Sequence, residues 1–377
     1  MSKKIFIMAG EPSGDLQGSF VIRELKKIID EDIIISGMAG DLCKEQGVEL
    51  VCNSMSSMSF VGPWHALGKI PFLIKCWYTI KRKLFEFQPD LVFMIDSPAW
   101  NMRMGRVTKK AGFKTVYFFP PSAWCKAEKR LKSIVSACDY VIPVFSSNVE
   151  TYKQFNLPHY YFGHPIVDIV KEKLDSCEDN ITPKDKTVIA FLPGSRKQEI
   201  DSLMNIFIKT MKMLMEKREN LFFVIPASCD TNKLLIESYL KKDDNIPYKI
   251  VTGGSYKAFK NARATVTASG TATLEAAIAG VPMTVVYRLA WPDYCLGKLL
   301  GIKVDFFAAP NLVVQRKIVP ELLQNEVNPE RLTAETLKLV DDTPERKQML
   351  SDLNEVKNNL GELGAVKRIA KFISEVI

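Results

Sequence analysis

The sequence predicts an α/β protein made of two doubly wound lobes with a helical tail. Short apolar runs typical of buried parallel strands alternate with amphipathic helical patterns. Several of these runs end in turns that contain Gly, Pro or Ser, and a charged, proline-containing stretch at 171–187 divides them into two series. The length of 377 residues is in keeping with two domains.

The first series of strands predicts an amino-terminal lobe over residues 1–170. It begins with an apolar strand at 4–9 and a Gly-containing turn at 10–15. A helix follows, and its apolar face carries Phe20, Val21, Leu25, Ile28 and Ile29. Strand, turn and helix in this order open a doubly wound domain. Further strands are predicted at 91–95, 115–119 and 140–144.

Residues 171–187 are predicted to form a linker, and a second lobe follows over 188–330. Its strands are predicted at 188–192, 222–226, 248–251, 264–267 and 283–287. Residues 331–377 are predicted to form a charged helical tail, which we expect to cross back to the first lobe or to a partner chain. Because ligands of such sheets bind at the carboxyl ends of the strands, a site is expected where the two lobes face each other.

Composition and charge exclude several classes of protein. A hydrophobic share of 47% and a charged share of 25% are typical of a globular protein and exclude a disordered or fibrous chain. The net charge of +8 is compatible with an acidic small molecule, an anionic membrane surface or a nucleic acid. No nucleic-acid-binding motif accompanies it, so a nucleic acid is not expected as a partner.

Cysteine and histidine usage predicts a reducing compartment and no metal centre. The eight cysteines are scattered without a CxxC pair and only three histidines are present, so neither a disulfide framework nor a zinc site is expected. The apolar run at 5–9 is too short for an export signal, and no run approaches the ~20 residues of a membrane-spanning helix. We therefore expect a cytoplasmic protein.

The turn at 10–15 carries two carboxylates, Glu11 and Asp15, beside two glycines. The glycines let the backbone turn tightly and approach a ligand. The carboxylates would repel a phosphate, and they suit sugar hydroxyls or proton transfer better. The alternative is an ordinary turn with a solvated Glu11 and with Asp15 near a helix start.

Two turns of the second lobe suit phosphate groups. Pro193-Gly194-Ser195-Arg196 offers outward backbone N–H groups and a fixed positive charge, and 268–275 opens another helix with small residues and hydroxyls. Glu275 follows one turn later and could accept from both ribose hydroxyls. Solvated, capped helix starts are the alternative interpretation. Together with the carboxylate turn, these turns favour a nucleotide-sugar donor in the second lobe and its acceptor in the first.

A series of motifs runs in order along most of the chain. They are AGEPSGD (9–15), Asp96 with Pro98 and Asn101, PSAW (121–124), GHPIVD (163–168), LPGSR (192–196) followed by Glu199-Ile200, ASGTATLE (268–275), PM-VVYR (282–288) and PNLVVQRKIVPELLQ (310–324). Taken together, the motifs resemble the lipid-A-disaccharide synthases over about residues 5–325.

The resemblance implies a GT-B glycosyltransferase that inverts the anomeric carbon and uses neither metal nor cofactor. Such an enzyme transfers 2,3-diacylglucosamine from UDP to the 6-hydroxyl of 2,3-diacylglucosamine 1-phosphate (lipid X). The products are a β-1,6-linked tetraacyl disaccharide 1-phosphate and UDP, formed at the cytoplasmic face of a Gram-negative envelope during lipid A assembly.

The resemblance also implies roles for single residues. Asp96 is the first candidate for the base that deprotonates the acceptor 6-hydroxyl, and Glu11 is the second. Arg196, the 269–273 helix start and Arg288 would stabilise the charge that develops on UDP. The residues expected to contact the donor are Gly194, Ser195, Arg196, Ser269, Gly270, Thr271, Thr273, Glu275, Arg288, Asn311, Arg316, Glu321 and Gln324. Those expected on the acceptor side are Ser13, Gly14, Asp15, Asn101, Ser122, Trp124 and His164.

Four stretches depart from the family's pattern, and three of them lie in the first lobe. His65 stands where the family has Glu, Ala99 stands where it has a second Asp, and 125–127 lacks a Trp and an Arg. In the second lobe, Val314-Gln315-Arg316 replaces Ala-Gly-Arg. Two alternatives therefore stay open. One is a related enzyme with a different amino-sugar or lipid acceptor, and the other is a catalytically silent homologue that binds sugar nucleotides or lipids.

Residues 60–87 combine aromatic and aliphatic side chains with the basic residues Lys69, Lys75, Lys81, Arg82 and Lys83. This mixture suits the surface of an anionic bilayer, which an enzyme acting on lipids must reach. The alternative is an ordinary packed helix with a basic solvated edge. We expect peripheral association with the inner face of the cytoplasmic membrane, and a homodimer is compatible with the helical tail.

Overall fold

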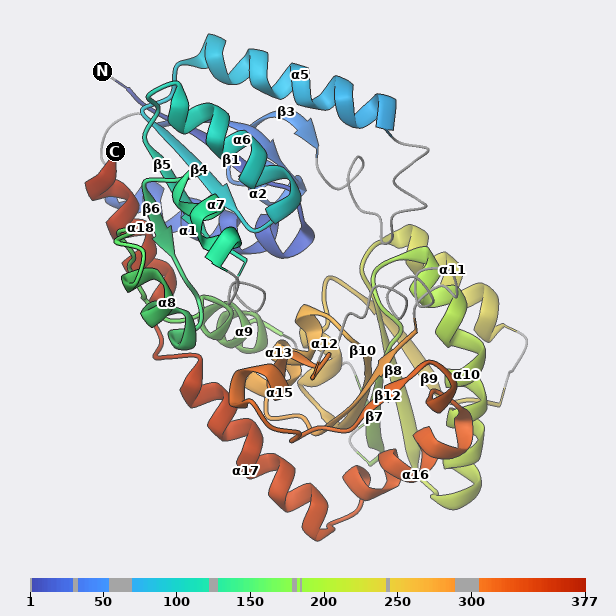
Figure 1. The fold of residues 1–377 in the computed structure, drawn as a ribbon. Helices are drawn as coiled ribbons and strands as arrows, with labels where there is room; N and C mark the ends of the chain where they lie inside the picture. Colours follow the sequence, from blue (N-terminus) through green and yellow to red (C-terminus); the bar gives the residue numbers. More distant parts are fainter. Residues whose placement is uncertain are drawn as a thin grey trace. The chain divides into compact units, whose positions relative to one another are not determined.

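A computed structural model describes residues 2–29, 33–53, 70–121, 128–177, 182–183, 185–241, 245–288 and 305–377. The chain divides into two units, one formed by Met1–Ile169 with Leu360–Ile377 and the other by Val170–Asn359. In the described residues each unit contains a six-stranded parallel sheet with helices on both faces (Figure 1). The two doubly wound sheets confirm the predicted fold class.

The sheet of the first unit has the strand order β3-β2-β1-β4-β5-β6. Its strands are β1 (Lys3–Ala9), β2 (Ile33–Ala39), β3 (Glu49–Asn53), β4 (Leu91–Ile95), β5 (Thr115–Phe118) and β6 (Tyr140–Ile142). Its helices are α1 (Pro12–Ile28), α2 (Asp41–Glu45), α5 (Ile70–Phe87), α6 (Pro98–Lys110), α7 (Glu128–Val135), α8 (Val149–Lys153) and α18 (Ala365–Val376), with a 3-10 turn at Ser146–Asn148. Helix α9 (Ile166–Asp175) passes into the second unit.

The central strand β1 shows how alternating side chains build two cores. Phe6 and Met8 lie on one face and belong to a buried cluster with Ile80 of α5. On the opposite face α1 approaches the sheet so closely that a Cβ on Gly18 would lie 2.9 Å from the Ile95 side chain of β4. Because helices cover both faces, Ile5–Ala9 of β1 and all of β4 are apolar and buried instead of alternating with polar residues.

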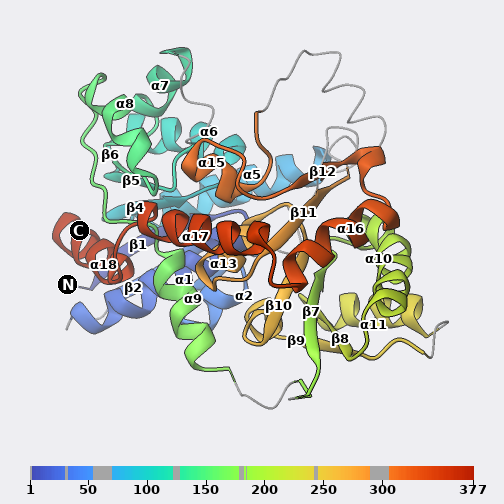
Figure 2. The ribbon, with the colours of Figure 1, turned by 90° about the horizontal axis from the view of Figure 1, so that it is seen from below.

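Helix α18, from the far end of the chain, packs on α1 in the first unit (Figures 1 and 2). The Asp168 carboxylate accepts hydrogen bonds from the backbone N–H groups of Gly364 (2.6 Å) and Val366 (2.8 Å), which fixes the start of α18. Phe372 packs against Tyr160 with ring centroids 4.4 Å apart. Within 331–377, therefore, α18 belongs to the first unit, whereas α17 (Pro344–Asn359) belongs to the second.

The sheet of the second unit has the strand order β12-β11-β10-β7-β8-β9. Its strands are β7 (Thr187–Leu192), β8 (Leu221–Ala227), β9 (Tyr248–Thr252), β10 (Ala262–Ala268), β11 (Met283–Tyr287) and β12 (Glu321–Leu323). Besides α17, its helices are α10 (Lys197–Lys217), α11 (Asp230–Leu240), α12 (Tyr256–Phe259), α13 (Thr271–Ile278), α15 (Ala309–Val314) and α16 (Pro329–Val340), with a 3-10 turn at Gln324–Glu326. All five strands predicted between 188 and 287 lie within these strands.

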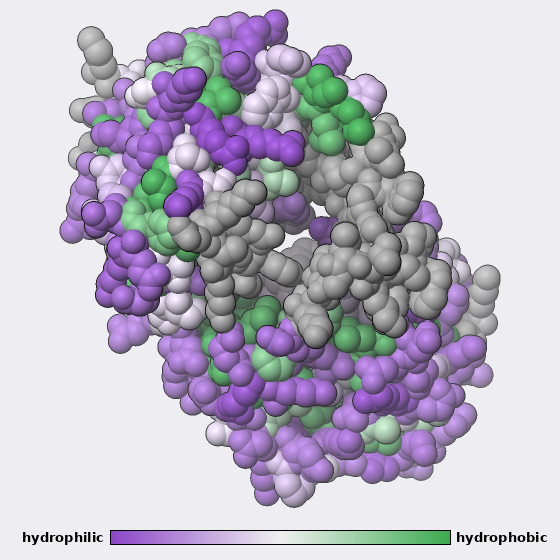
Figure 3. Space-filling view, in the orientation of Figure 1, coloured by the Kyte–Doolittle hydropathy of each residue, from purple (hydrophilic) through white to green (hydrophobic). Residues whose placement is uncertain are grey.

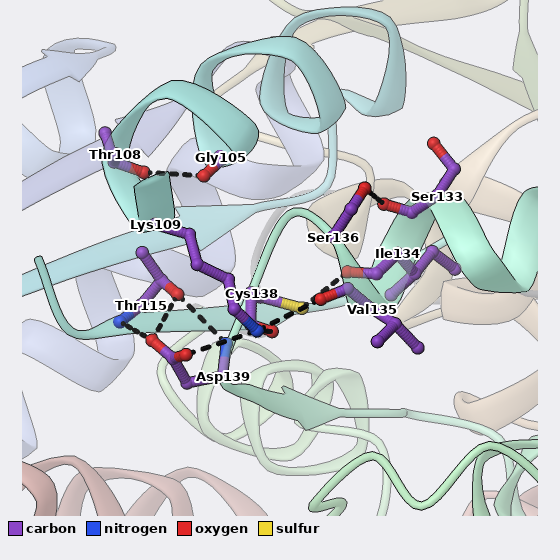
Figure 4. A network of polar contacts seen from close by, with 10 residues as sticks. All are labelled: Gly105, Thr108, Lys109, Thr115, Ser133, Ile134, Val135, Ser136, Cys138 and Asp139. Carbon is purple, nitrogen blue, oxygen red and sulfur yellow. Dashed lines mark hydrogen bonds and ion pairs between the residues drawn. The ribbon is translucent and has the colours of Figure 1, made fainter. Parts of the chain in front are cut away.

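A polar network holds the starting ends of β5 and β6, opposite to the carboxyl ends where ligands of such sheets bind (Figure 4). Asp139 Oδ2 accepts from the backbone N–H and the hydroxyl of Thr115 at 2.9 and 2.7 Å. Lys109, in the last turn of α6, lies 3.2 Å from Asp139 Oδ1 and donates to Val135 O at the end of α7. The lysine thus offsets the negative end of α7 and ties three elements together away from the candidate site.

Among the described helices, none is long and apolar enough to cross a membrane.

Candidate active site

The carboxyl ends of β1 and β4 bring two predicted loops together in the first unit. The strands are paired in parallel with Ala9 opposite Ile95, so the turn after β1 lies beside the residues after β4. Gly10 is required there, because a Cβ on it would lie 2.5 Å from the Ser97 hydroxyl oxygen. A Cβ on Gly14 would make an ordinary contact of 3.4 Å with the Ile95 carbonyl oxygen, so packing does not require a glycine at this position.

Asp96 begins a strained turn. Its φ is 51° and that of Ser97 is 47°, so two consecutive non-glycine residues are left-handed. The buried Asn101 amide donates to the carbonyl oxygens of Asp96 (2.8 Å) and Ile95 (3.1 Å), and the Tyr117 hydroxyl donates to Asp96 O at 2.9 Å. Strained backbone of this kind persists where surrounding contacts hold it in place, and it is common at active sites.

The Asp96 side chain is partly buried, and its surroundings adjust its proton affinity. Burial raises the pKa of Asp96 above its ordinary value, while hydrogen bonds from the Ser13 hydroxyl and the Ser97 backbone N–H act in the opposite direction. The Ser13 bond joins Oγ to Asp96 Oδ2 at 3.0 Å. A carboxylate with a raised pKa is a better proton acceptor, which is the property expected of a general base.

Two other predicted residues of the first unit, Asp15 and Asn101, have structural partners. Asp15 is 2% exposed, and its carboxylate accepts from the backbone N–H groups of Gly40, Leu42 and Cys43 at 2.8–3.1 Å, so it holds the start of α2. Asn101 is fully buried and holds the Asp96 turn. Both are therefore positioned to shape the site rather than to be reached easily by an acceptor.

His164 is also buried, at 1% exposure, against the rings of Phe119 and Phe145. Burial lowers the pKa of His164 to about 3, so the ring is neutral near pH 7. Its Nδ1 accepts from the Ile166 backbone N–H at 3.1 Å. Glu11 is half-buried and directly precedes α1, where its carbonyl accepts from the Asp15 backbone N–H at 3.0 Å.

Several expected residues lie outside the described part of the chain. They are Ser122 and Trp124, the departures at 61–67 and 125–127, and residues 60–69 of the predicted membrane segment.

In the second unit, the turn after β7 donates hydrogen bonds to the side-chain carboxylate of Glu199 on α10. Glu199 Oε2 accepts from the backbone N–H groups of Ser195 (2.9 Å) and Arg196 (3.1 Å), and Oε1 accepts from the Arg196 guanidinium at 3.0 Å. Gly194 has φ 101°, and a Cβ on it would lie 2.2 Å from Glu199 Oε2. Asn232 donates to Ser195 O at 2.7 Å. Two backbone N–H groups and a guanidinium thus converge on the Glu199 carboxylate, which forms a capping box at the start of α10. A phosphate at this helix start stays a prediction.

The turn after β10 leads into α13. Among the described residues, none has an atom within 4 Å of a Cβ built on Gly270, so those residues leave this helix start open. Thr271 is the first residue of α13, and the Thr273 hydroxyl donates to Gly270 O at 2.8 Å. The Ser269 hydroxyl donates to Phe307 O at 2.8 Å and ties the turn to the segment before α15.

Glu275, the predicted ribose ligand, is buried in α13. The Ser255 hydroxyl donates to Oε2, and the Tyr256 hydroxyl donates to Oε1 at 2.9 Å. Burial raises the pKa of Glu275, and both hydroxyl donors counteract this rise. Ser255 and Tyr256 were not predicted as site residues. The available signal was the Gly253-Gly254-Ser255-Tyr256 turn, which follows strand β9.

Asn311 and Glu321 support each other. The fully buried Asn311 accepts from the backbone N–H groups of Ile318 (2.7 Å) and Val319 (3.0 Å) and donates to Glu321 Oε1 at 2.8 Å. Glu321 also accepts from the Ala308 N–H at the start of α15. These contacts are structural, and a direct contact with the donor stays a prediction.

The remaining donor-side residues lie nearer to solvent. Arg316 forms ion pairs with Asp352 (2.9 Å) and Glu355 of α17. Arg288 is exposed and donates to Ser202 O at 3.1 Å. Gln324 is left-handed with φ 50° and begins the 3-10 turn at 324–326. In the described ranges, no group of three or more His, Cys, Asp or Glu side chains could hold a metal ion.

Solved structures with the same architecture define the class of fold. The chain is similar to the MnaA–UDP co-structure from S. aureus (TM-score 0.65, 14% identity, 100% of this chain and 98% of that chain). It is also similar to the UDP-GlcNAc 2-epimerase from Neisseria meningitidis bound to UDP-GlcNAc (TM-score 0.67, 14% identity, 99% of each chain) and to MurG from Acinetobacter baumannii (TM-score 0.56, 14% identity, 100% of each chain). The fold is therefore of the GT-B class.

Sequence comparison narrows this class to one family. The family model described as lipid-A-disaccharide synthetase matches residues 5–374. Lipid-A-disaccharide synthases from Persephonella marina and Coxiella burnetii are 34% and 30% identical over 385 and 379 residues, covering 99–100% of this chain and 99% of each relative. The chain belongs to the lipid-A-disaccharide synthase family, which confirms the resemblance predicted from its motifs.

Proposed function

We propose that this glycosyltransferase transfers 2,3-diacylglucosamine from UDP to the 6-hydroxyl of lipid X and forms the β-1,6-linked tetraacyl disaccharide 1-phosphate of lipid A assembly. Family membership supports the type of reaction. The observation that carries the chemistry is Asp96. Its carboxyl group is partly buried at the carboxyl end of β4, in a strained turn fixed by Asn101 and Tyr117.

In the proposed reaction Asp96 removes the proton from the acceptor 6-hydroxyl. The oxygen attacks the anomeric carbon while the bond from that carbon to the diphosphate oxygen breaks, and the bonding electrons leave with UDP. A single displacement of this kind inverts the anomeric carbon. Glu11 is the second candidate for the base, since it lies in the turn beside the Asp96 loop.

The proposed donor groups stabilise the negative charge that develops on UDP. Arg196 and the N–H groups at the start of α10 supply positive charge, and the open start of α13 supplies a second set of N–H groups. Glu199 accepts from these donors in the structure, and in the proposed complex the diphosphate competes with it for them. With this cationic set the proposed reaction needs no metal ion.

The proposal is tested by measuring UDP release from UDP-2,3-diacylglucosamine in detergent micelles, with and without lipid X. Release that depends on lipid X supports the proposal. Release that occurs only with a different amino sugar or lipid favours the related enzyme with a rebuilt acceptor side, which the departures at 61–67 and 97–100 motivate. UDP binding without release with any acceptor favours the silent homologue.

For its lipid substrates, we propose that α5 contacts an anionic membrane surface on the cytoplasmic side. One face of the helix is buried through Cys76, Ile80 and Leu84. Its other side exposes Ile74 at 51% and Tyr78 at 66%, and basic residues of the helix are exposed beside them. Figure 3 shows hydrophobic surface over the end at which α5 begins, with hydrophilic surface nearby. Exposed apolar and basic groups on one helix are typical of interfacial binding.

Replacing Ile74 and Tyr78 together by Ser is expected to weaken binding to vesicles that contain anionic phosphatidylglycerol by roughly 10-fold or more, because two apolar side chains would no longer be buried in the bilayer surface. Co-sedimentation at several salt concentrations measures this effect. Leu234→Ser is the control, since Leu234 is 65% exposed on α11 of the second unit and should leave binding unchanged. Equal vesicle binding by the α5 variant and the unaltered protein would contradict the proposal.

A further inference from the structure

Ser13 is placed to act on the reaction through Asp96. It is the second residue of α1, and its hydroxyl donates to Asp96 Oδ2 at 3.0 Å across the pair of loops that follow β1 and β4. We propose that Ser13 is a positioning residue that orients the Asp96 carboxylate toward the acceptor hydroxyl and stabilises its ionised form. This inference rests on the proposed role of Asp96 as the base.

The backbone around Ser13 leaves it little freedom. Pro12 begins α1, and its fixed φ suits the first helical turn. A Cβ on Gly10 would lie 2.5 Å from the Ser97 hydroxyl oxygen, so the turn packs closely against the residues after β4. A hydrogen bond between two rigid loops directs a carboxylate more firmly than one from a mobile surface side chain, because little conformational freedom is lost.

The Asp96 carboxylate accepts hydrogen bonds from the Ser13 hydroxyl and the Ser97 N–H, and the neighbouring titratable groups have other contacts or lie elsewhere. The Asp15 carboxylate on α1 accepts hydrogen bonds from backbone N–H groups at the start of α2. The Tyr117 hydroxyl on β5 donates to the backbone carbonyl of Asp96 and not to its carboxylate. Glu11 lies in the same turn as Ser13, and the first charged residue of α6, Arg103, is exposed. The hydrogen bonds from Ser13 and from the Ser97 N–H both lower the pKa of Asp96 against the effect of burial.

The sign of the expected effect follows from this balance. Removing the Ser13 hydroxyl takes away a donor to the ionised carboxylate, so the pKa of Asp96 rises. A general base must be deprotonated to act, and activity therefore falls as the pH drops through that pKa. In Ser13→Ala the acid limb of the profile of kcat/KM against pH should move to higher pH. Ser13→Thr keeps a hydroxyl and should keep the limb in place.

The experiment compares pH profiles of the unaltered enzyme, Ser13→Ala, Ser13→Thr and Asp96→Asn, with UDP release as the assay. For Ser13→Ala we expect the acid limb to shift upward by about one pH unit, which is roughly a 10-fold loss on that limb, with most activity recovered at high pH and UDP affinity unchanged. Ser19→Ala is the matched control, because the Ser19 hydroxyl lies on the same helix and donates to Leu16 O. Alanine is a good helix former, so Ser13→Ala should fold.

The outcomes separate this inference from the function on which it rests. If Asp96→Asn is inactive and Ser13→Ala keeps the limb of the unaltered enzyme, the Ser13 inference is wrong while the base assignment stands. A uniform loss at every pH, with the limb in its original place, would overturn the proposed stabilisation of ionised Asp96, because the hydroxyl would then act on the position of the carboxylate alone. If Asp96→Asn keeps full activity, the proposed base and the role of Ser13 fail together.

Discussion

Asp96→Asn is expected to lower kcat by about 10²–10⁴-fold while UDP affinity stays within about two-fold of the original value. Asparagine keeps the size of the side chain and can still accept from the Ser13 hydroxyl, but it cannot take a proton from the acceptor. The Asp96 turn is held through its backbone carbonyl by Asn101 and Tyr117, so the substitution should leave the fold intact. Rates of UDP release and calorimetric titration with UDP measure the two effects.

Two variants accompany this prediction. Asp90→Asn is the control. Asp90 lies directly before the first residue of β4, at the end of the strand away from Asp96, and its carboxylate accepts from the Lys4 backbone N–H. Glu11→Gln tests the second candidate base. Full turnover in Asp96→Asn, together with loss of turnover in Glu11→Gln, would transfer the role of base to Glu11.

Arg196→Ala is expected to weaken UDP binding by about 10- to 100-fold, corresponding to the roughly 1.5–3 kcal/mol of a hydrogen bond to a charged group. The guanidinium lies at the start of α10 beside two backbone N–H groups, and the variant would leave Glu199 there without a cationic partner. Affinity for uridine, which has no phosphate, should not change. Calorimetric titration with UDP and with uridine separates the two contributions.

The control for this prediction is Arg218→Ala, which removes an equal charge from the same unit. Arg218 forms an ion pair with Asp341 and does not lie in any turn predicted to bind the donor. If Arg196→Ala lowers the affinities for UDP and for uridine equally, the side chain maintains the binding pocket as a whole and does not bind the diphosphate specifically. If UDP affinity is unchanged, the diphosphate assignment is wrong.

Buried parallel strands were predictable because their side chains are apolar on both faces. The runs at 91–95 and 283–287 coincide with β4 and β11. Strand β2 escaped prediction because Ser36 and Gly37 interrupt its apolar run. Gly37 is required by packing, since a Cβ on it would lie 2.0 Å from the Ile7 carbonyl oxygen. Strand β3 begins with the exposed Glu49 and is otherwise only half-buried, so it lacks the apolar run by which the other strands were predicted.

The site was predictable where chemistry follows a strand end, as at Asp96 and Arg196. The partners of buried polar groups were less predictable, because they come from distant segments. Asp15 bonds the backbone of Gly40, which lies 25 residues along the chain. Glu275 bonds Ser255, which lies 20 residues before it. A single sequence contains the residue types but not these pairings, which tertiary folding determines.

The most direct test of the account is the structure of the product. The enzyme is incubated with UDP-2,3-diacylglucosamine and lipid X. The masses of the lipid products are measured by mass spectrometry, and the new glycosidic linkage is assigned by NMR. The account predicts a tetraacyl disaccharide 1-phosphate with a β-1,6 linkage. An α linkage would contradict the single displacement, and UDP formation without any disaccharide would contradict lipid X as the acceptor.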